Sequence, residues 1–452
     1  MSRQFKTVDY EATLQTSVRL ADCLPPNHFA RFVVDIVAQL DLKPLYDRYG
    51  NRGGEPYAPE ILLALLFYAY ATGVFASRKI EQATKETAAF RYLAGNLSPD
   101  HDTLAHFRKN FLPQIQPLFV QILLLAQHAG FLQLGNISLD GTKIHADASK
   151  SKAVSYQRLL ELQVKLEAQV QQLFALAEQA DQSSVPEGMS LPAEIARRED
   201  RLKALAEAKI VLEARAKQRY AFEQAEYEAK LREREENQAR TGKKPPGRPP
   251  TPPSPEPKAD DQYNFTDPDS RIMKNSRDGG FDQHYNAQAA VEQESLFLVG
   301  HSLSPHANDQ YEVAPTLASI PACLGTPSAA ALDTGYFSKA NLRVLQEAGI
   351  EAYIATGRDP HNRSWEAYFA EAGEAPGAEA TLREKMAHKL RTARGKAIYR
   401  RRKCTIEPVF GQIKAVLGFR QFSLRGLSQA AGEWCLVCLA FNLRRLHVLT
   451  VG

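Results

Sequence analysis

A stretch at residues 155–240 differs in composition from the rest of the chain, because Ala, Glu, Gln, Lys, Arg and Leu dominate it. Leu159, Leu162 and Leu166 recur there at spacings of three and four, which is the apolar period of a helix. A break follows at 182–188, where a proline and a glycine interrupt the pattern. The stretch therefore predicts two long helices that pair as an antiparallel coiled-coil hairpin.

A proline-rich segment follows this predicted hairpin. Residues 241–258 hold eight prolines, a composition that predicts an extended linker. Part of it, 243–248, also weakly resembles an arm that binds the DNA minor groove, but a plain linker is favoured. We assign 153–240 to the hairpin and 241–261 to the linker. Strands are predicted on both sides, so the hairpin is an insertion that leaves and re-enters one domain.

Residues from about 25 to 128 predict helices alone. Pro59 opens an apolar run that is hydrophobic nearly all round, which is typical of a helix at the centre of its domain. A polar turn at 98–103 precedes a helix whose exposed face carries Arg108 and Lys109. Such helices fit a helix-turn-helix DNA reader, and the pattern alone favours an ordinary helical bundle. We interpret residues 1–128 as an all-α N-terminal domain for DNA binding or assembly.

An acidic residue interrupts a predicted strand just before the insertion. Ile137 and Leu139 alternate with Ser138, Asp140 and Thr142, which is the period of a half-buried strand. A carboxylate within a strand-forming run is unfavourable. Asp140 therefore needs an exposed edge, a charged partner or a metal ion.

Two more carboxylates stand at comparable positions downstream. Asp333 follows a predicted strand at 329–332 and precedes a Gly-Tyr turn. Glu407 lies on a predicted amphipathic helix between Lys403 and Lys414, at offsets of four and seven that share one face. On its own that helix favours a surface ladder of ion pairs. The alternative is a site for a phosphate and a metal ion.

Charge is distributed unevenly along the chain. The net charge is only +4, yet residues 383–403 contain ten Lys and Arg and one acid. Such a run is suited to phosphates, and the alternative is a solvated loop. Five scattered cysteines predict no disulfide framework. The first residues show no apolar signal core, so we expect a soluble protein of the cytoplasm.

The order of the expected elements limits the possible folds. It runs strand, helical insertion, two strands, helix, strand, helix, strand, helix. This order is compatible with an RNase H-like α/β domain, a mixed sheet flanked by helices, formed by residues 129–152 and 262–452. Hard oxygen ligands on converging elements would suit phosphodiester cleavage by two Mg²⁺ ions.

The three acidic blocks together resemble the DDE transposases of bacterial insertion sequences, in the group with a Tyr…Arg…Glu…Lys signature. Asp140-Gly-Thr-Lys-Ile is similar to the first block of that family. Asp333-Thr-Gly-Tyr, with Asn341, matches the second block, Asp-x-Gly-Tyr-x4-Asn. The third block is matched by Tyr399, Arg402 or Lys403, Glu407 and Lys414.

The resemblance implies a function and a set of site residues. Asp140, Asp333 and Glu407 would be catalytic and would bind two Mg²⁺ ions, for which Mn²⁺ may substitute in the family. The basic and aromatic residues of the third block would bind DNA phosphates: Tyr399, Arg400, Arg401, Arg402, Lys403 and Lys414. The expected partners are the terminal inverted repeats of the element, target DNA and further copies of the chain in a dimer or larger synaptic assembly. A bacterial, nucleoid-associated location is implied as well.

The sequence departs from the family pattern at one position. Lys403 stands where the family usually has Arg, four residues before Glu407, and Lys cannot make a bidentate phosphate contact. Either Arg402 has taken the role or a point charge suffices. Asp147 is a rival carboxylate in the first block, but on a continuing strand it would face away from Asp140.

Two other functions remain open from the sequence. The basic run and the helical hairpin would suffice for a DNA-binding or assembly protein without catalysis. A simple RNase H-like nuclease would need the same carboxylates and would lack strand transfer.

Overall fold

The computed structural model describes residues 19–49, 56–180, 190–242, 247–275, 279–357, 373–377 and 379–452. The helix break predicted at 182–188 and most of the possible minor-groove arm lie outside these residues. The chain divides into two compact units. One comprises Met1–Ile144 and Asn286–Gly452, and the other comprises His145–Tyr285. The predicted domain boundaries stay a prediction.

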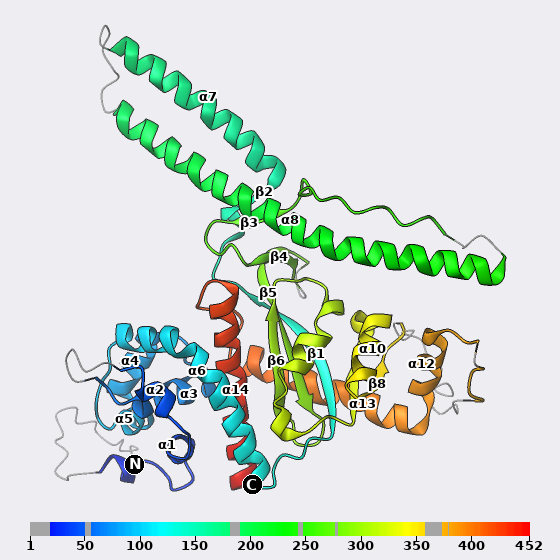
Figure 1. Ribbon diagram of the computed structural model, residues 1–452. Helices are drawn as coiled ribbons and strands as arrows, with labels where there is room; N and C mark the ends of the chain where they lie inside the picture. The colour runs from blue at the N-terminus through cyan, green and yellow to red at the C-terminus, as the bar shows by residue number, and fades with distance from the viewer. Residues whose placement is uncertain are drawn as a thin grey trace, which may run out of the picture. The chain divides into compact units, whose positions relative to one another are not determined.

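The described part of the N-terminal region is helical, as predicted (Figure 1). Its elements are η1 (Leu20–Cys23), α1 (Phe29–Val37), α2 (Lys43–Tyr46), α3 (Pro59–Ala71), α4 (Ser77–Glu86), α5 (Ala88–Leu93) and α6 (His101–His128). Pro59 is the first residue of α3, and nearly every side chain of that helix is buried. The carboxylate of Asp100 caps α6 by accepting a hydrogen bond from the Thr103 amide. Arg108, predicted for the exposed face of this helix, is instead buried and donates to the Tyr70 hydroxyl.

The last helix, α14 (Leu427–Val451), belongs to the core of the first unit. It packs against α3, α6 and a strand of the sheet. By length and composition it is apolar enough to cross a membrane, but 61% of its most apolar window is buried inside the protein. A core helix of this length passes the same test as a membrane span. Burial against its neighbours therefore accounts for its apolar character.

A mixed sheet forms the centre of the α/β region, as predicted. Its strands are β1 (Asn136–His145), β4 (Arg271–Lys274), β5 (Phe281–Glu292), β6 (Leu298–Ser304), β7 (Ala329–Leu332) and β8 (Glu351–Ile354). The order is β4-β5-β1-β7-β8, and β6 also pairs with β5. The β1, β7 and β8 strands are parallel, whereas β4 and β6 are antiparallel to β5.

Helices and helical turns flank this sheet (Figure 1). They are η3 (Asp309–Tyr311), α9 (Val313–Ala318), η4 (Ala322–Leu324), η5 (Thr334–Tyr336), α10 (Lys339–Glu347), α12 (Leu382–Arg391), α13 (Ala393–Gly411) and the π-helical turn η6 (Gln412–Val416). The α13 helix packs on β7 and β8, where Ile398 joins buried Ala331 and Tyr353. The β6 strand is covered by α9 and α14.

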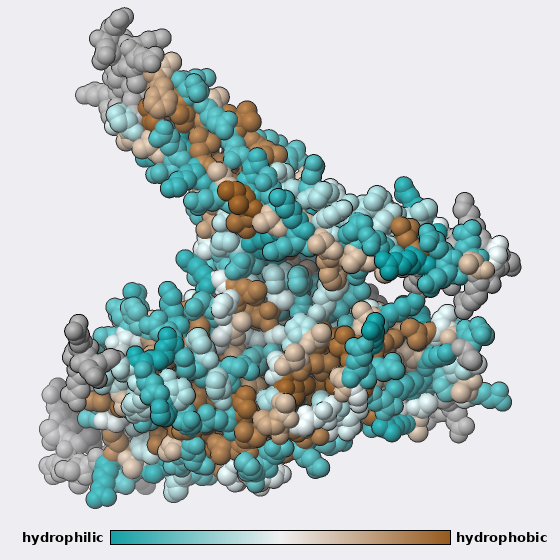
Figure 2. Space-filling model, viewed as in Figure 1, coloured by the Kyte–Doolittle hydropathy of each residue, from teal (hydrophilic) through white to brown (hydrophobic). Residues whose placement is uncertain are grey.

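The second unit contains the two long helices predicted from the apolar repeat. They are α7 (Tyr156–Ala180) and α8 (Leu191–Thr241), accompanied by η2 (Lys150–Lys152), β2 (Ala153–Ser155) and β3 (Gln262–Asn264). Near β2 and β3 the helices enclose a core that includes Leu159, Leu166, Leu205 and Leu212. Farther along, Val164 and Phe174 are exposed, and Figure 2 shows brown apolar surface on the hairpin. A coiled-coil insertion stays a prediction.

Candidate active site

The hydrogen-bond register of two parallel strands brings the first two predicted carboxylates together. Ser138 pairs with Ala331 and Leu139 pairs with Leu332, so Asp140 is the next residue of β1 and Asp333 is the first residue after β7. Neighbouring strands lie about 4.8 Å apart. The sequence predicts Asp140 within one strand and Asp333 directly after another, and the pairing of these two strands brings the two acids close together.

The polar face of β1 lies against α13 and the turn that follows it. Ser138, Asp140 and Thr142 alternate along the strand and so share one face. Thr405 donates a hydrogen bond to the Ser138 hydroxyl over 2.7 Å. Lys414 donates to the Thr142 hydroxyl over 3.0 Å from the π-helical turn η6. Short π-helical segments are frequent at functional sites.

Asp140 has the charged partner that an acid within a strand requires. Arg402 donates to the Asp140 carboxylate over 2.7 Å, and a second guanidinium nitrogen lies 3.9 Å from Glu407. The Arg402 side chain is only 9% exposed, because it lies four residues before the buried Ile406 on the same helix face. Lys403, by contrast, is exposed. Of the two basic residues left open by the sequence, Arg402 is the one that reaches the carboxylates.

Glu407 is held less firmly than the acids of the strands. Its side chain is 56% exposed, and its nearest cationic partner is Arg402 at 3.9 Å. Lys414, which the ladder interpretation would place beside Glu407, donates to Thr142 and to the Lys143 carbonyl. The Arg402 guanidinium therefore lies near both carboxylates and links Glu407 to Asp140.

The electrostatics show that acidic groups accumulate around Asp140. Burial raises the pKa of Asp140 to about 6, Arg402 opposes this shift, and the nearby charges of Asp333 and Asp309 add to it. The Gly141 amide donates to Asp140 and lowers its pKa in turn. Asp309 is not among the carboxylates that the sequence singles out. No local signal distinguishes it, because its proximity depends on tertiary contacts.

The donor chemistry of this cluster fits a divalent cation. Carboxylate oxygens are the ligands that Mg²⁺ prefers. The negative charges of Asp333 and Asp309 repel that of Asp140, and a bound cation would offset this repulsion. Within the residues that the structure describes, no three Asp, Glu, His or Cys side chains converge as a ready-made metal site. The guanidinium of Arg402 instead supplies the positive charge between Asp140 and Glu407.

The basic run is partly neutralised by acids within the fold. Arg401 forms an ion pair with Glu294, and both Lys389 and Arg394 bind Glu351. Arg400 and Lys403 are exposed on α13.

Tyr399 of the same helix lies at the edge of the hydrophobic core. It is half-buried against the cluster formed by β7, β8 and α13. Its ring centroid lies 5.9 Å from the Arg402 guanidinium carbon. The phosphate-binding roles of these residues stay a prediction. The rival carboxylate Asp147 lies beyond the end of β1 and belongs to the second unit.

Two family models match separate parts of the chain. A family model described as a transposase domain (DUF772) matches residues 18–110. A second model, described as a transposase DDE domain, matches residues 376–447, which include α13 with Glu407. No match was found among curated proteins or among solved structures. The resemblance to the DDE transposases of insertion sequences, predicted from the three acidic blocks, is confirmed.

Proposed function

We propose that this chain catalyses the metal-dependent cleavage of DNA at the ends of an insertion sequence and the transfer of the cut strand to target DNA. The observation that carries the proposal is the register of the parallel strands β1 and β7, which brings Asp140 on β1 close to Asp333 at the end of β7. The mixed sheet with helices on it is compatible with an RNase H-like fold, which we propose for 129–152 and 262–452.

Asp140, Asp333 and Glu407 are the proposed ligands of two Mg²⁺ ions, with Mn²⁺ as a substitute. Bound there, the ions would activate the attacking oxygen and stabilise the leaving oxygen of an in-line displacement. Asp140 contributes a carboxylate on a rigid strand, and Asp333 contributes one fixed by the hydrogen bond that its Oδ1 accepts from the Gly335 amide over 2.8 Å. Glu407 contributes a more adaptable carboxylate from the exposed side of α13.

The basic residues next to the carboxylates have proposed roles toward DNA. Arg402 holds Asp140 in the protein alone and can turn its guanidinium to a phosphate oxygen when a cation takes over the carboxylate. Arg400 and Lys403, exposed on the same helix, would contact the DNA backbone. Lys414 bonds to the edge of β1 and would present its charge beside Asp140.

The remaining regions have proposed roles in assembly. The helical region at 1–128, part of which matches a transposase domain, would bind DNA or hold the synaptic complex. Two element ends must be cut together, so the functional form would be a dimer or larger assembly on terminal inverted repeats. The hairpin at 153–240, with exposed apolar side chains, is a candidate for holding these partners.

The test compares wild-type protein with Asp140→Asn on DNA from both flanks of the gene. In the presence of Mg²⁺ we expect the wild type to nick each flanking DNA at the end of the insertion sequence. We also expect it to join the cut ends to a target plasmid. Asp140→Asn should lose nicking and keep DNA binding in a gel-shift assay. Nicking that survives Asp140→Asn would contradict the assignment. Nicking without joining would indicate a nuclease, and binding without nicking would indicate a DNA-binding protein.

A further inference from the structure

On the face of β1 behind Asp140, a buried polar network lies against Gly141. Gly141 follows Asp140, so a side chain there would point to the opposite face of the sheet. A Cβ atom on Gly141 would lie 2.3 Å from Nε2 of Gln288 and 2.6 Å from Oδ1 of Asp309. Both distances are far below a normal contact. The glycine is needed because these polar side chains lie directly against the strand backbone.

Gln288 is the centre of this network. It is fully buried on β5, and its Nε2 donates to Oδ1 of Asp309 over 2.8 Å. Its Oε1 accepts a hydrogen bond from the Tyr336 hydroxyl over 2.5 Å, and its backbone carbonyl accepts one from the Trp434 indole. The side-chain amide is thus used on both its nitrogen and its oxygen. A fully satisfied buried amide of this kind has one orientation and holds its partners in place.

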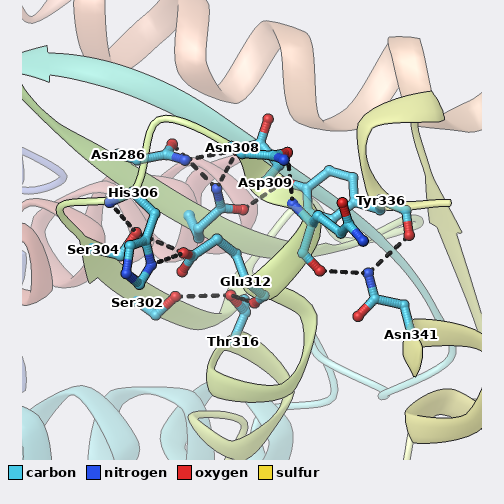
Figure 3. Close-up of polar contacts among 12 residues, drawn as sticks. Asn286, Ser302, Ser304, His306, Asn308, Asp309, Glu312, Thr316, Tyr336 and Asn341 are labelled. Atoms are coloured by element: carbon cyan, nitrogen blue, oxygen red, sulfur yellow. Dashed lines mark hydrogen bonds and ion pairs between the residues drawn. The ribbon is translucent and has the colours of Figure 1, made fainter. Parts of the chain in front are cut away.

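Tyr336 connects Gln288 to the turn that carries Asp333. Tyr336 is fully buried and belongs to η5, the helical turn that Asp333 caps. Asn341 donates one hydrogen bond to the Tyr336 carbonyl and another to the Gln310 carbonyl, each over 2.8 Å. Figure 3 shows Tyr336 and Asn341 side by side next to Asp309. The turn after β7 is therefore tied both to β5 and to η3.

The segment that carries Asp309 is anchored in the same way. Asp309 also accepts from the Asn286 amide over 2.7 Å. Three residues farther on, Glu312 is buried and accepts from the Ser304 hydroxyl over 2.7 Å at the end of β6. His306 contacts the same carboxylate (Figure 3). The network thus rests on fixed elements and is not a loose surface cluster.

We propose that Gln288 and Tyr336 are positioning residues that fix the Asp333 turn relative to Asp140, and that they set the separation of these two carboxylates. The inference rests on the proposed metal site. Few residues separate this network from the two carboxylates. Gln288 lies over Gly141, the neighbour of Asp140, and Tyr336 lies three residues after Asp333. Groups that orient metal ligands from behind typically change metal affinity or activity roughly 10- to 100-fold when they are removed.

A purely structural role for the network would have a different signature. Loss of a buried hydrogen bond lowers stability wherever it occurs, but it changes metal affinity only if the bond positions the ligands. Tyr285 provides the matched control, because it is a buried tyrosine whose hydroxyl donates to Asp267 over 2.8 Å and lies outside the proposed site. Tyr336→Phe and Tyr285→Phe each remove one buried hydroxyl from the protein.

The experiment titrates the full-length protein with Mn²⁺, without DNA, and follows binding by electron paramagnetic resonance. We expect wild type and Tyr285→Phe to bind with affinities within about twofold of each other, and Tyr336→Phe to bind roughly tenfold or more weakly. Thermal melting of each variant shows that the protein is folded at the temperature of the titration. Equal binding by Tyr336→Phe and wild type would overturn the positioning role.

Two further variants separate this inference from the proposed function. Asp333→Asn should abolish the tight Mn²⁺ site, and if it does not, the proposed metal site is wrong and the positioning role is wrong with it. If Asp333→Asn abolishes binding while Tyr336→Phe leaves it unchanged, only the positioning role fails. Gly141→Ala perturbs the network from its other side. Weaker Mn²⁺ binding by folded Gly141→Ala protein would support the positioning role. If Tyr336→Phe does not fold, unchanged Mn²⁺ affinity in Gly141→Ala would overturn that role.

Discussion

Asp333 and Glu407 belong to the same proposed site but are placed by different means. Asp333 follows a central strand, its position is determined by backbone register with β1, and its side chain caps the next turn. Glu407 lies on the exposed side of a helix and reaches the site through Arg402 at 3.9 Å. The end of the strand therefore supplies a proposed ligand held by strand pairing and a side-chain hydrogen bond, whereas the helix supplies a proposed ligand that depends on a longer contact with Arg402.

The largest expected difference between the two is in catalysis. Asp333→Asn removes a charge from the fixed pair and should lower DNA cleavage by about 10³-fold or more, since a metal ion contributes several kcal/mol to transition-state stabilisation. Glu407→Gln removes an exposed, adaptable carboxylate and should cost less, roughly 10²-fold. Single-turnover nicking assays at saturating Mg²⁺ would measure both. A greater loss of nicking activity in Glu407→Gln than in Asp333→Asn would contradict the larger contribution expected of Asp333.

Arg402 is the link between the strand and the helix, and its removal should have the next largest effect. Arg402→Ala leaves the Asp140 carboxylate buried and unpaired, which should lower the free energy of unfolding by roughly 3 kcal/mol in metal-free protein. Chemical denaturation would measure this loss.

A double variant supplies the control for Arg402. Adding Asp140→Asn to Arg402→Ala removes the unpaired charge, so most of the lost stability should return. No recovery in the double variant would show that Arg402 acts through contacts other than Asp140.

The raised pKa of Asp140 predicts a pH-dependent stability. The folded protein holds this proton up to a pKa of about 6, whereas an unfolded Asp releases it near 3.8. The folded state therefore binds more protons between these values, and stability should fall as pH rises from about 4 to 6, by about 3 kcal/mol at most. Denaturation of chelator-treated wild type and Asp140→Asn across this range would test it. The part of the pH dependence of stability that Asp140 causes should be absent in Asp140→Asn. An identical pH dependence in the two proteins would contradict the raised pKa of Asp140.

The contact between Thr405 and Ser138 should give the smallest effect. Thr405→Val replaces a buried hydroxyl by a methyl group and should cost about 1–2 kcal/mol of stability, because the helix loses its hydrogen bond to β1. Thr450→Val is the control, since that hydroxyl bonds to the Leu446 carbonyl of its own helix. The control should change stability by less than about 0.5 kcal/mol. Equal effects at both positions would show that the contact does not help to hold α13.

The sequence predicted the local elements of the site well. Alternation at 137–142 gave the strand and singled out Asp140, and the apolar repeat gave the helix of Glu407. The spacing of four pointed to Lys403 as the partner of Glu407, but the structure places Arg402 there. The reason is the phase of the helix, since Arg402 shares its face with the buried Ile406.

The long-range parts of the site left no trace in the sequence pattern. The register between β1 and β7 joins segments separated by the whole insertion, and no local period encodes it. Asp309 and Gln288 become important only because Gly141 lets them approach β1. Buried polar residues of this kind read as ordinary strand or turn positions until the fold brings them together.

The proposed function requires that Asp140, Asp333 and Glu407 hold divalent cations together. Replacing Mg²⁺ by Fe²⁺ and adding ascorbate and peroxide cuts a polypeptide chain close to the bound ion, and mass spectrometry locates the cuts. The account predicts cuts near residues 140, 333 and 407, all suppressed by excess Mg²⁺ and lost together in Asp333→Asn. Cuts confined to other parts of the chain, or cuts that persist unchanged in Asp333→Asn, would contradict it.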